Sequence, residues 1–310
     1  MTIQQIKYII AVEEFNHFGL AAEKCFVTQS TLSTMIGKFE EEIGIRIFDR
    51  STKPVTVTLE GEMLLPQLKI ILKEVDSLNE RVKLMKGEVS GKLKIGIIPT
   101  VAPYVLPRFL GDFVNNYPKM HFSVSELTTD NIVEQIKSRA LDIGIAALPL
   151  GDDSLIEYPI YNESFVLYDC FSNKPSSSVK IEDINYDKFW LLEEGHCLSN
   201  QVIKICDIRN KNAPVNLDFR AGTIDTLIRF VKQNHGITLL PCLATADFSE
   251  EDRQRLSHFN GSVPVRSIGI VTHKHFVKKQ VLSLLSEKIR ENIVPLLQLS
   301  SRENQIITPL

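Results

Sequence analysis

Long hydrophobic runs are missing from this sequence. No stretch approaches the ~18 consecutive apolar residues that a membrane-spanning helix needs, and the N-terminal segment MTIQQIKYIIAVEEF reaches Glu13 and Glu14 without a signal-peptide cleavage pattern. These absences predict a cytoplasmic protein with no membrane partner. The chain has 310 residues, of which 44% are hydrophobic, and is therefore long enough for roughly two domains with apolar cores.

Cysteine is also scarce, with 5 residues in the whole chain. In a reducing compartment these cysteines do not predict a structural framework, so any disulfide would be transient, catalytic or sensory. The chain contains no Walker loop, no GxGxxG and no HExxH, and His273 and His275 have no nearby cysteine or carboxylate to complete a metal site. We therefore expect neither a cofactor nor a bound metal.

Residues 1–58 have the spacing of a winged helix-turn-helix. The segments IKYIIAVEEF and GLAAEKC predict two helices, and VTQSTLSTMIGKFEEEIG predicts a third that begins after Thr28 and ends at Gly44. One apolar stripe on the third helix is expected to be buried, formed by Leu32, Ile36, Phe39 and Ile43. Its first turns carry amide and hydroxyl side chains that could pair with base edges in a major groove, namely Thr28, Gln29, Ser30, Thr31 and Ser33.

Net positive charge is absent from this segment. Residues 1–57 contain six Lys or Arg and seven Asp or Glu. Three of the basic residues, Arg46, Arg50 and Lys53, cluster in IRIFDRSTKPVTVT, which is typical of a short wing that contacts phosphates. A three-helix domain with a polar outer face would show the same periodicity, so the pattern alone leaves DNA binding open.

Residues 59–90 predict a linker and dimerisation helix followed by a hinge. Seven apolar residues alternate four and three positions apart over about three heptads: Leu64, Leu68, Ile71, Val75, Leu78, Val82 and Met85. Because Gly61 and Pro66 disturb the first turns, the alternative is an amphipathic helix packed on its own domain. The glycine-containing segment KGEVSGK then indicates the domain boundary.

Residues 91–310 predict an α/β domain. Strands rich in Ile and Val alternate with segments of helical spacing, and they include KLKIGIIPT, HFSVSEL, LDIGIAAL, ESFVLYDCF, FWLLEE, GITLLPCL and RSIGIVTH. The fold class expected for the whole chain is therefore α/β, with the winged helix-turn-helix and the long helix in front of this domain.

Several of these segments resemble LysR-type transcriptional regulators over nearly the whole chain. The run AAEKCFVTQSTLSTMIGKFEEEIGIRIFDR followed by VTLEGE is similar to the DNA-binding head of that family, and KLKIGIIPTVAPYVLP with GITLLP is similar to the effector domain. The segment GHC, eight further residues and a second Cys resembles the peroxide-sensing members. The family implies a winged helix, a linker helix, two α/β subdomains like those of periplasmic binding proteins, and a tetramer.

The resemblance implies that Cys197 is the peroxidatic thiol and Cys206 the resolving thiol. Cys197 follows the flexible Gly195 and the polar His196, whereas Cys206 ends an apolar run. Pocket positions that hold peroxide or support the thiolate match Thr100, Thr129 and Arg266, with His196 beside them. A regular helix over residues 197–206 would separate the two Cα atoms by roughly 13.5 Å, whereas a disulfide needs less than ~7 Å, so bond formation would have to unwind the segment.

The other cysteines, Cys25, Cys170 and Cys242, lie in apolar contexts and are expected to be small buried hydrophobes. Three functions remain open: a peroxide-sensing regulator, a regulator whose metabolite binds between the subdomains near Thr100, and a thiol peroxidase. The predicted head disfavours an enzyme. The first hypothesis implies hydrogen peroxide, a double-stranded DNA operator, a homodimer or homotetramer, RNA polymerase and a thiol reductant such as glutaredoxin or thioredoxin.

Overall fold

The computed structural model describes residues 1–85, 90–172, 175–184, 188–192, 198, 201–202, 221–260, 263–297 and 304–306. The chain divides into two compact units, residues 1–88 and 89–310, and has the mixed α/β architecture that the sequence predicts. Among the described helices, none combines the length and the apolar character that crossing a membrane demands.

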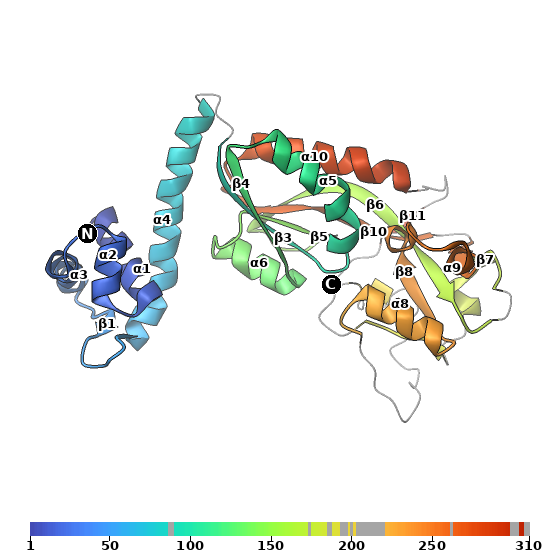
Figure 1. Cartoon of the computed structure of the whole chain (residues 1–310), viewed down its shortest axis with the longest axis horizontal. Coiled ribbons are helices and arrows are strands. Elements are labelled where there is room, and N and C mark those ends of the chain that lie inside the picture. Colours follow the sequence, from blue (N-terminus) through green and yellow to red (C-terminus); the bar gives the residue numbers. More distant parts are fainter. Residues whose placement is uncertain are drawn as a thin grey trace. The chain divides into compact units, whose positions relative to one another are not determined.

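The first unit is a small helical domain with a two-stranded hairpin and a long following helix (Figure 1). Its elements are α1 (Ile3–Phe15), α2 (Phe18–Lys24), α3 (Gln29–Ile43), β1 (Phe48–Asp49), β2 (Thr56–Val57) and α4 (Leu59–Met85). Thr28 caps α3, and Gly44 ends it in the left-handed conformation at φ 71°. The predicted stripe is buried at Leu32, Ile36 and Phe39, whereas Ile43 is only half-buried.

The helix α4 continues through both Gly61 and Pro66. Its first half packs on its own domain, because Leu65 and Leu68 belong to the same core as α1, α2 and α3. Farther along, the side chain of Leu78 is 62% exposed and that of Val82 45% exposed. The packed-helix alternative therefore describes the start of α4, and the second half carries an apolar seam that this chain alone leaves uncovered.

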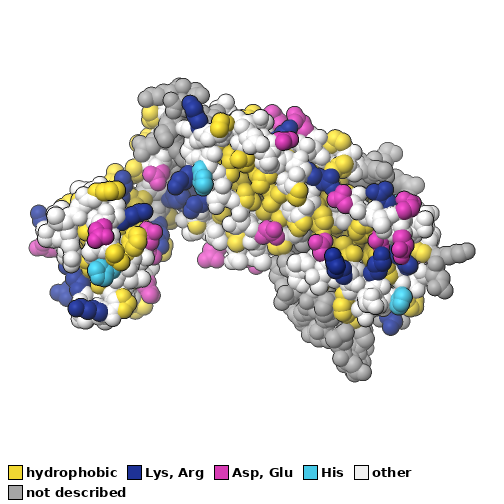
Figure 2. Space-filling model, viewed as in Figure 1, with side chains coloured by type: hydrophobic (Ala, Val, Ile, Leu, Met, Phe, Trp, Pro, Cys, Tyr) yellow, Lys and Arg dark blue, Asp and Glu magenta, His cyan; other side chains and the backbone are white. Residues whose placement is uncertain are grey.

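The second unit is an α/β domain in which strands and helices alternate, and hydrophobic side chains gather over the middle of the face of this unit that Figure 2 shows. Its strands are β3 (Gly91–Ile97), β4 (Met120–Glu126), β5 (Ile143–Leu148), β6 (Leu155–Asp169), β7 (Ser178–Val179), β8 (Ile237–Pro241), β9 (Leu256–Phe259), β10 (Val263–His273) and β11 (Asn304–Ile306). Its helices are α5 (Ala102–Asn116), α6 (Thr129–Lys137), α8 (Ile224–Gln233), α9 (Glu250–Arg253) and α10 (Lys279–Ile293), with 3-10 turns η1 (Ile181–Asp183), η4 (Cys242–Thr245) and η5 (Val294–Leu296).

The described strands of this unit form one sheet with the path β4-β3-β5-β10-β6-β9-β7, to which β11 adds on β10 and β8 on β6. The strand β3 is parallel to β4 and β5, whereas β10 is antiparallel to β5 and β6. The register of β10 and β6 shifts between Ile268 and Gly269. A Cβ on Gly269 would lie only 2.5 Å from the carbonyl oxygen of Tyr158, so the register shift needs glycine at this position.

Two hydrophobic cores divide the sheet into two lobes. In lobe 1, α5 and α10 lie side by side over one face and α6 covers the other, around β3, β4 and β5 (Figure 1). Lobe 2 is built on the second half of β6 together with β8, β9 and α8. The long strands β6 and β10 pair with each other and connect the two lobes. The side chains near the middle of β6 therefore lie between the two cores.

Most of the predicted strands are present, with two differences. The segment FWLLEE forms only isolated bridges at Phe189 and Leu192 within its described part, because Phe189 pairs with Ile237 and Leu192 with Ala221. The strand β6 begins at Leu155, well before the predicted ESFVLYDCF. Its first half, from Leu155 to Tyr161, has no regular alternation of buried and exposed side chains and includes Pro159, so the sequence pattern did not predict a strand there.

Candidate functional site

The start of α3 presents a group of exposed polar side chains. Thr28 Oγ1 accepts a hydrogen bond from the backbone N–H of Thr31 at 3.2 Å, and it also lies within hydrogen-bond distance of the Ser30 and Thr31 hydroxyls. Thr28, Gln29, Ser30 and Thr31 are all exposed, whereas Ser33 is half-buried. The cap therefore fixes the backbone at the start of α3, while the side chains predicted to meet base edges stay exposed except for Ser33, and their contact with bases stays a prediction.

A buried carboxylate fastens the wing to α3. Glu40 Oε1 accepts the backbone N–H groups of Ile47 at 2.8 Å and Phe48 at 3.2 Å, and Glu40 Oε2 accepts Arg50 at 2.9 Å. Arg50 also donates to Ser33 Oγ at 3.1 Å, and its guanidinium lies 5.0 Å from the ring centroid of Phe18. The sequence predicted Arg50 as a phosphate contact. The structure pairs it with Glu40 and Ser33 while 42% of its side chain stays exposed, so the phosphate contact stays a prediction.

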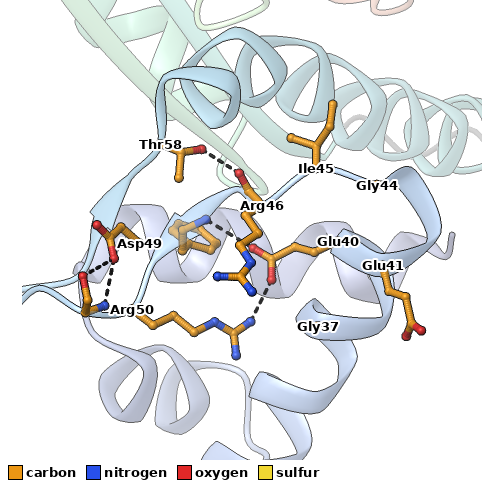
Figure 3. A pocket seen from close by; sticks show the side chains of 11 residues that line it. Gly37, Glu40, Glu41, Gly44, Ile45, Arg46, Asp49, Arg50 and Thr58 are labelled. Carbon is orange, nitrogen blue, oxygen red and sulfur yellow. Dashed lines mark hydrogen bonds and ion pairs between the residues drawn. The ribbon is translucent and has the colours of Figure 1, made fainter.

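An open hollow of about 830 Å³ lies beside this ion pair, between the end of α3, the wing and Thr58 (Figure 3). Arg46 and Arg50 line it together with Glu40, Glu41 and Asp49. Because carboxylates and guanidinium groups alternate around the hollow, it is poorly suited to an anion. Lys53 is exposed in the loop between β1 and β2 and keeps its predicted availability to a phosphate.

The second site lies on the antiparallel pair β6 and β10, between the two lobes. Arg266 and Glu163 face each other in the antiparallel register and form an ion pair whose side chains are 1% and 0% exposed. Arg266 Nε donates to Glu163 Oε1 at 2.7 Å, and the two terminal nitrogens donate to Thr100 Oγ1 and to the Thr100 carbonyl, both at 3.1 Å. Glu163 Oε2 accepts the backbone N–H of Leu243 at 3.3 Å.

Two of the predicted site residues follow adjacent strands of lobe 1. Thr100 follows β3 and Thr129 follows β4, and the carboxyl ends of adjacent parallel strands meet at one edge of a sheet. Among the described residues, neither the Thr129 hydroxyl nor the Tyr161 hydroxyl has a hydrogen-bond partner, although both atoms are buried. Burial, together with the charge of Glu163, raises the pKa of Tyr161 well above its usual value. Both hydroxyls are therefore buried polar groups whose hydrogen-bonding capacity is unused among the described residues.

Sequence analysis predicted Thr100, Thr129 and Arg266 as site residues but missed Glu163. The structure joins Thr100 directly to Arg266 and gives Thr129 a buried, unpaired hydroxyl. Glu163 comes from a strand 103 positions away from its partner, so no local motif could have paired them. The only sequence signal for Glu163 was a carboxylate directly before a strongly apolar run.

The three described thiols have environments unsuited to redox chemistry. Burial raises the pKa of Cys25, Cys170 and Cys242, which lowers the thiolate fraction that could attack an oxidant. Cys170 is buried and the other two are half-buried, in partial agreement with the expected buried hydrophobes.

The predicted peroxidatic and resolving positions, Cys197 and Cys206, lie outside the described residues, as does His196. Their described neighbours Leu198 and Val202 are buried in the core of lobe 2, with exposed fractions of 1% and 3%. The described residues between the two cysteines are therefore packed in lobe 2, and the unwinding step stays a prediction.

Two family models match the chain. A model described as "Bacterial regulatory helix-turn-helix protein, lysR family" matches residues 3–62, and one described as "LysR substrate binding domain" matches residues 86–293. Among curated proteins, the Escherichia coli K12 "DNA-binding transcriptional dual regulator OxyR" is 33% identical over 94% of this chain and 95% of its own. A "Probable hydrogen peroxide-inducible genes activator" of Mycobacterium leprae is 33% identical over 87% of each chain.

Solved structures match the same extent of the chain. A full-length cysteine variant of OxyR from Pseudomonas aeruginosa is similar with a TM-score of 0.74, at 28% identity, over 95% of this chain and 99% of that one. A cysteine variant of OxyR from Corynebacterium glutamicum, described as bound to H2O2, gives a TM-score of 0.61 at 28% identity over 96% and 94%. Both matches therefore extend over the two units of this chain.

Proposed function

Because the chain belongs to the LysR family of bacterial transcriptional regulators, we propose that it is a regulator that binds double-stranded DNA and responds to hydrogen peroxide. The observation that supports this most directly is the match to relatives named for hydrogen peroxide across both units of the chain, at 33% identity over 94% of its length. The motif of Cys197 and Cys206 supplies the two thiols that such a response needs.

The proposed chemistry is a two-step oxidation. The Cys197 thiolate attacks one oxygen of the peroxide, the O–O bond breaks, and a sulfenic acid forms with release of hydroxide. The Cys206 thiol then condenses with the sulfenic acid, which forms the disulfide and releases water. A dithiol reductant such as thioredoxin or glutaredoxin returns both thiols by exchange.

In this proposal the disulfide acts as a conformational switch. The segment that joins the two cysteines contains Leu198 and Val202, which contribute to the core of lobe 2. A helical segment would have to unwind before the sulfurs could meet, so oxidation exchanges local packing for a covalent bond.

The alternative of a metabolite-responsive regulator uses the same inter-lobe site. The unpaired Thr129 hydroxyl favours it, because a polar effector could satisfy that buried group. The two alternatives differ in their dependence on cysteine: a metabolite response survives replacement of both Cys197 and Cys206. A thiol peroxidase would have no use for the exposed polar start of α3, and we propose a regulator rather than an enzyme.

Replacement of Gln29 by Ala should lower the specific affinity for DNA by about tenfold, because a side-chain amide that pairs with a base edge contributes about 1–3 kcal/mol. The probe is a duplex selected by the unmodified protein from a random-sequence pool, and mobility-shift titration measures the affinity. Peroxide-dependent loss of free thiols should be unchanged. An unaltered affinity for the selected duplex would remove Gln29 from the recognition surface.

Charges on the exposed seam of α4 should separate the DNA-binding heads. In the double variant Val75→Glu and Leu78→Glu, like charges would meet across a paired helix, and loss of pairing should reduce operator affinity by at least about 100-fold. Sedimentation velocity should show a smaller species. The exposed Asp76 lies on the same turns, so Asp76→Ala serves as the matched control. A double variant that sediments like the unmodified protein would mean that another surface holds the subunits together.

A further inference from the structure

Phe26 has an unusual backbone position in the turn between α2 and α3. Its backbone N–H donates to the Glu23 carbonyl at 3.1 Å, and the N–H of Val27 donates to the Ala22 carbonyl at 3.0 Å. These two bonds form a Schellman motif, in which Phe26 is the residue with left-handed backbone, at φ 55°. Glycine or asparagine is favoured at such a position, and a bulky aromatic residue adopts it at a cost.

The side chain of Phe26 gains nothing from packing that could offset this cost. It is 95% exposed, more than any other large hydrophobic side chain among the described residues, of which Met63 is next at 77%. An isolated exposed hydrophobic residue is ordinary, but here exposure and an unfavourable backbone angle coincide at one position. Because both its exposure and its backbone angle are unfavourable for the isolated chain, Phe26 points to a contact with another molecule.

The place of Phe26 in the head indicates which partner its ring would meet. It lies two residues before the α3 cap Thr28, so its Cα is within about 8 Å of the Cα of Thr28 at 3.8 Å per residue. Phe26 is therefore exposed in the turn directly before the polar group formed by Thr28, Gln29, Ser30 and Thr31, which is exposed as well. A ligand that meets the start of α3 comes within reach of this ring.

The low positive charge of the head makes an apolar contact important for DNA affinity. Residues 1–57 carry no net positive charge, and between the exposed Lys24 at the end of α2 and Lys38 on the third turn of α3 the chain has no basic residue. Few phosphates can therefore be neutralised by residues 25–37, although such contacts ordinarily supply much of the affinity for DNA. Thymine methyl groups and deoxyribose rings offer an apolar surface that needs no positive charge.

We propose that Phe26 is a DNA-contacting residue whose ring packs against deoxyribose and thymine methyl groups at the edge of the site that α3 enters. The proposal rests on the proposed DNA binding of the head. Its contribution to affinity is apolar, so it is independent of salt, in contrast to contacts such as those of Lys53 with phosphate.

The test replaces Phe26 by Asn in the full-length protein. Asparagine accepts the left-handed backbone, so the thermal midpoint should stay the same or rise. Affinity for the selected duplex, measured by fluorescence anisotropy from 50 to 300 mM NaCl, should fall about five- to tenfold at every salt concentration, with an unchanged slope of log affinity against log salt. Phe26→Leu should retain part of the affinity. The control Ile3→Gln removes another exposed apolar side chain, 46% exposed on α1, and should leave affinity unchanged.

Four outcomes would overturn the proposal. Equal affinity of Phe26→Asn and the unmodified protein removes the contact, and an altered salt slope assigns the effect to charge. A smaller species in sedimentation means that Phe26 contacts a second copy of the chain instead. If the unmodified protein selects no duplex, the proposed DNA binding itself fails, whereas a normal selection followed by an insensitive variant sinks only the role of Phe26.

Discussion

Replacement of Cys197 by Ser should abolish the thiol response to hydrogen peroxide. The chain has 5 cysteines, and a disulfide between two of them lowers the count of free thiols from five to three in the unmodified protein. Cys197→Ser should keep its four remaining thiols under the same treatment, because the described thiols have raised pKa values and react slowly. A thiol-reactive chromophore in denaturant measures the count before and after peroxide.

Cys206→Ser should behave differently from Cys197→Ser. Without a resolving thiol, the sulfenic acid at Cys197 persists and is trapped by a dimedone-type reagent, and mass spectrometry locates the adduct. Cys25→Ser is the matched control, since Cys25 lies in the first unit with its thiol pKa raised by burial, and it should still form the disulfide. Primary oxidation at Cys206, or a full response in Cys197→Ser, would contradict the assignment of roles.

The local architecture of the head follows from sequence signals that lie close together in the chain. A hydroxyl at Thr28, apolar residues at helical spacing and a glycine at position 44 are enough to define α3 and its buried stripe. Each signal acts within a turn or two of helix, so it predicts the local structure before the fold is known. The exposed polar start of α3 follows from the same signals.

The burial of charged side chains could not be predicted in this way. Nothing in the local sequence distinguishes Glu40 and Glu163 from surface carboxylates, yet each is buried because its partners come from elsewhere in the fold. The two N–H groups and the guanidinium around Glu40 lie seven to ten residues away, and Arg266 lies 103 residues from Glu163. Pairing across such separations depends on how strands align in the sheet, which a period of apolar residues does not specify.

The seam of α4 shows a third kind of limit. The heptad pattern is compatible both with a helix that packs on its own domain and with one that pairs with a second copy. The structure divides these roles along the helix, since Leu68 is buried in the head while Leu78 is exposed. A sequence period reports which residues share a face, and only the fold reveals what covers that face at each turn.

Loss of one partner of the buried pair between Glu163 and Arg266 should be the most destabilising single substitution in the second unit. Glu163→Ala leaves a guanidinium that is 1% exposed without its counter-charge, which costs about 3–5 kcal/mol. The single tryptophan, Trp190, packs against Phe230 with ring centroids 4.8 Å apart in lobe 2, so its fluorescence reports unfolding of this unit. Urea titration of the full chain gives the change in midpoint.

A surface ion pair provides the control for this experiment. Lys137 and Asp152 form a pair in which the lysine side chain is 47% exposed, and Lys137→Ala should shift the midpoint little. A Glu163→Ala midpoint that matches the control would mean that Arg266 finds water or another acceptor once Glu163 is gone.

The double variant Glu163→Ala with Arg266→Ala separates the penalty of an unpaired charge from the worth of the pair. With both groups removed, no charge remains buried, so the double variant should be more stable than the sum of the two single losses predicts, by roughly 1–3 kcal/mol. Thr100 then loses its two hydrogen bonds from Arg266 in both the Arg266→Ala and the double variant, and that loss cancels in the cycle. If the losses of unfolding free energy in the two single variants add up strictly, the two side chains would instead stabilise the pairing of β6 and β10 independently.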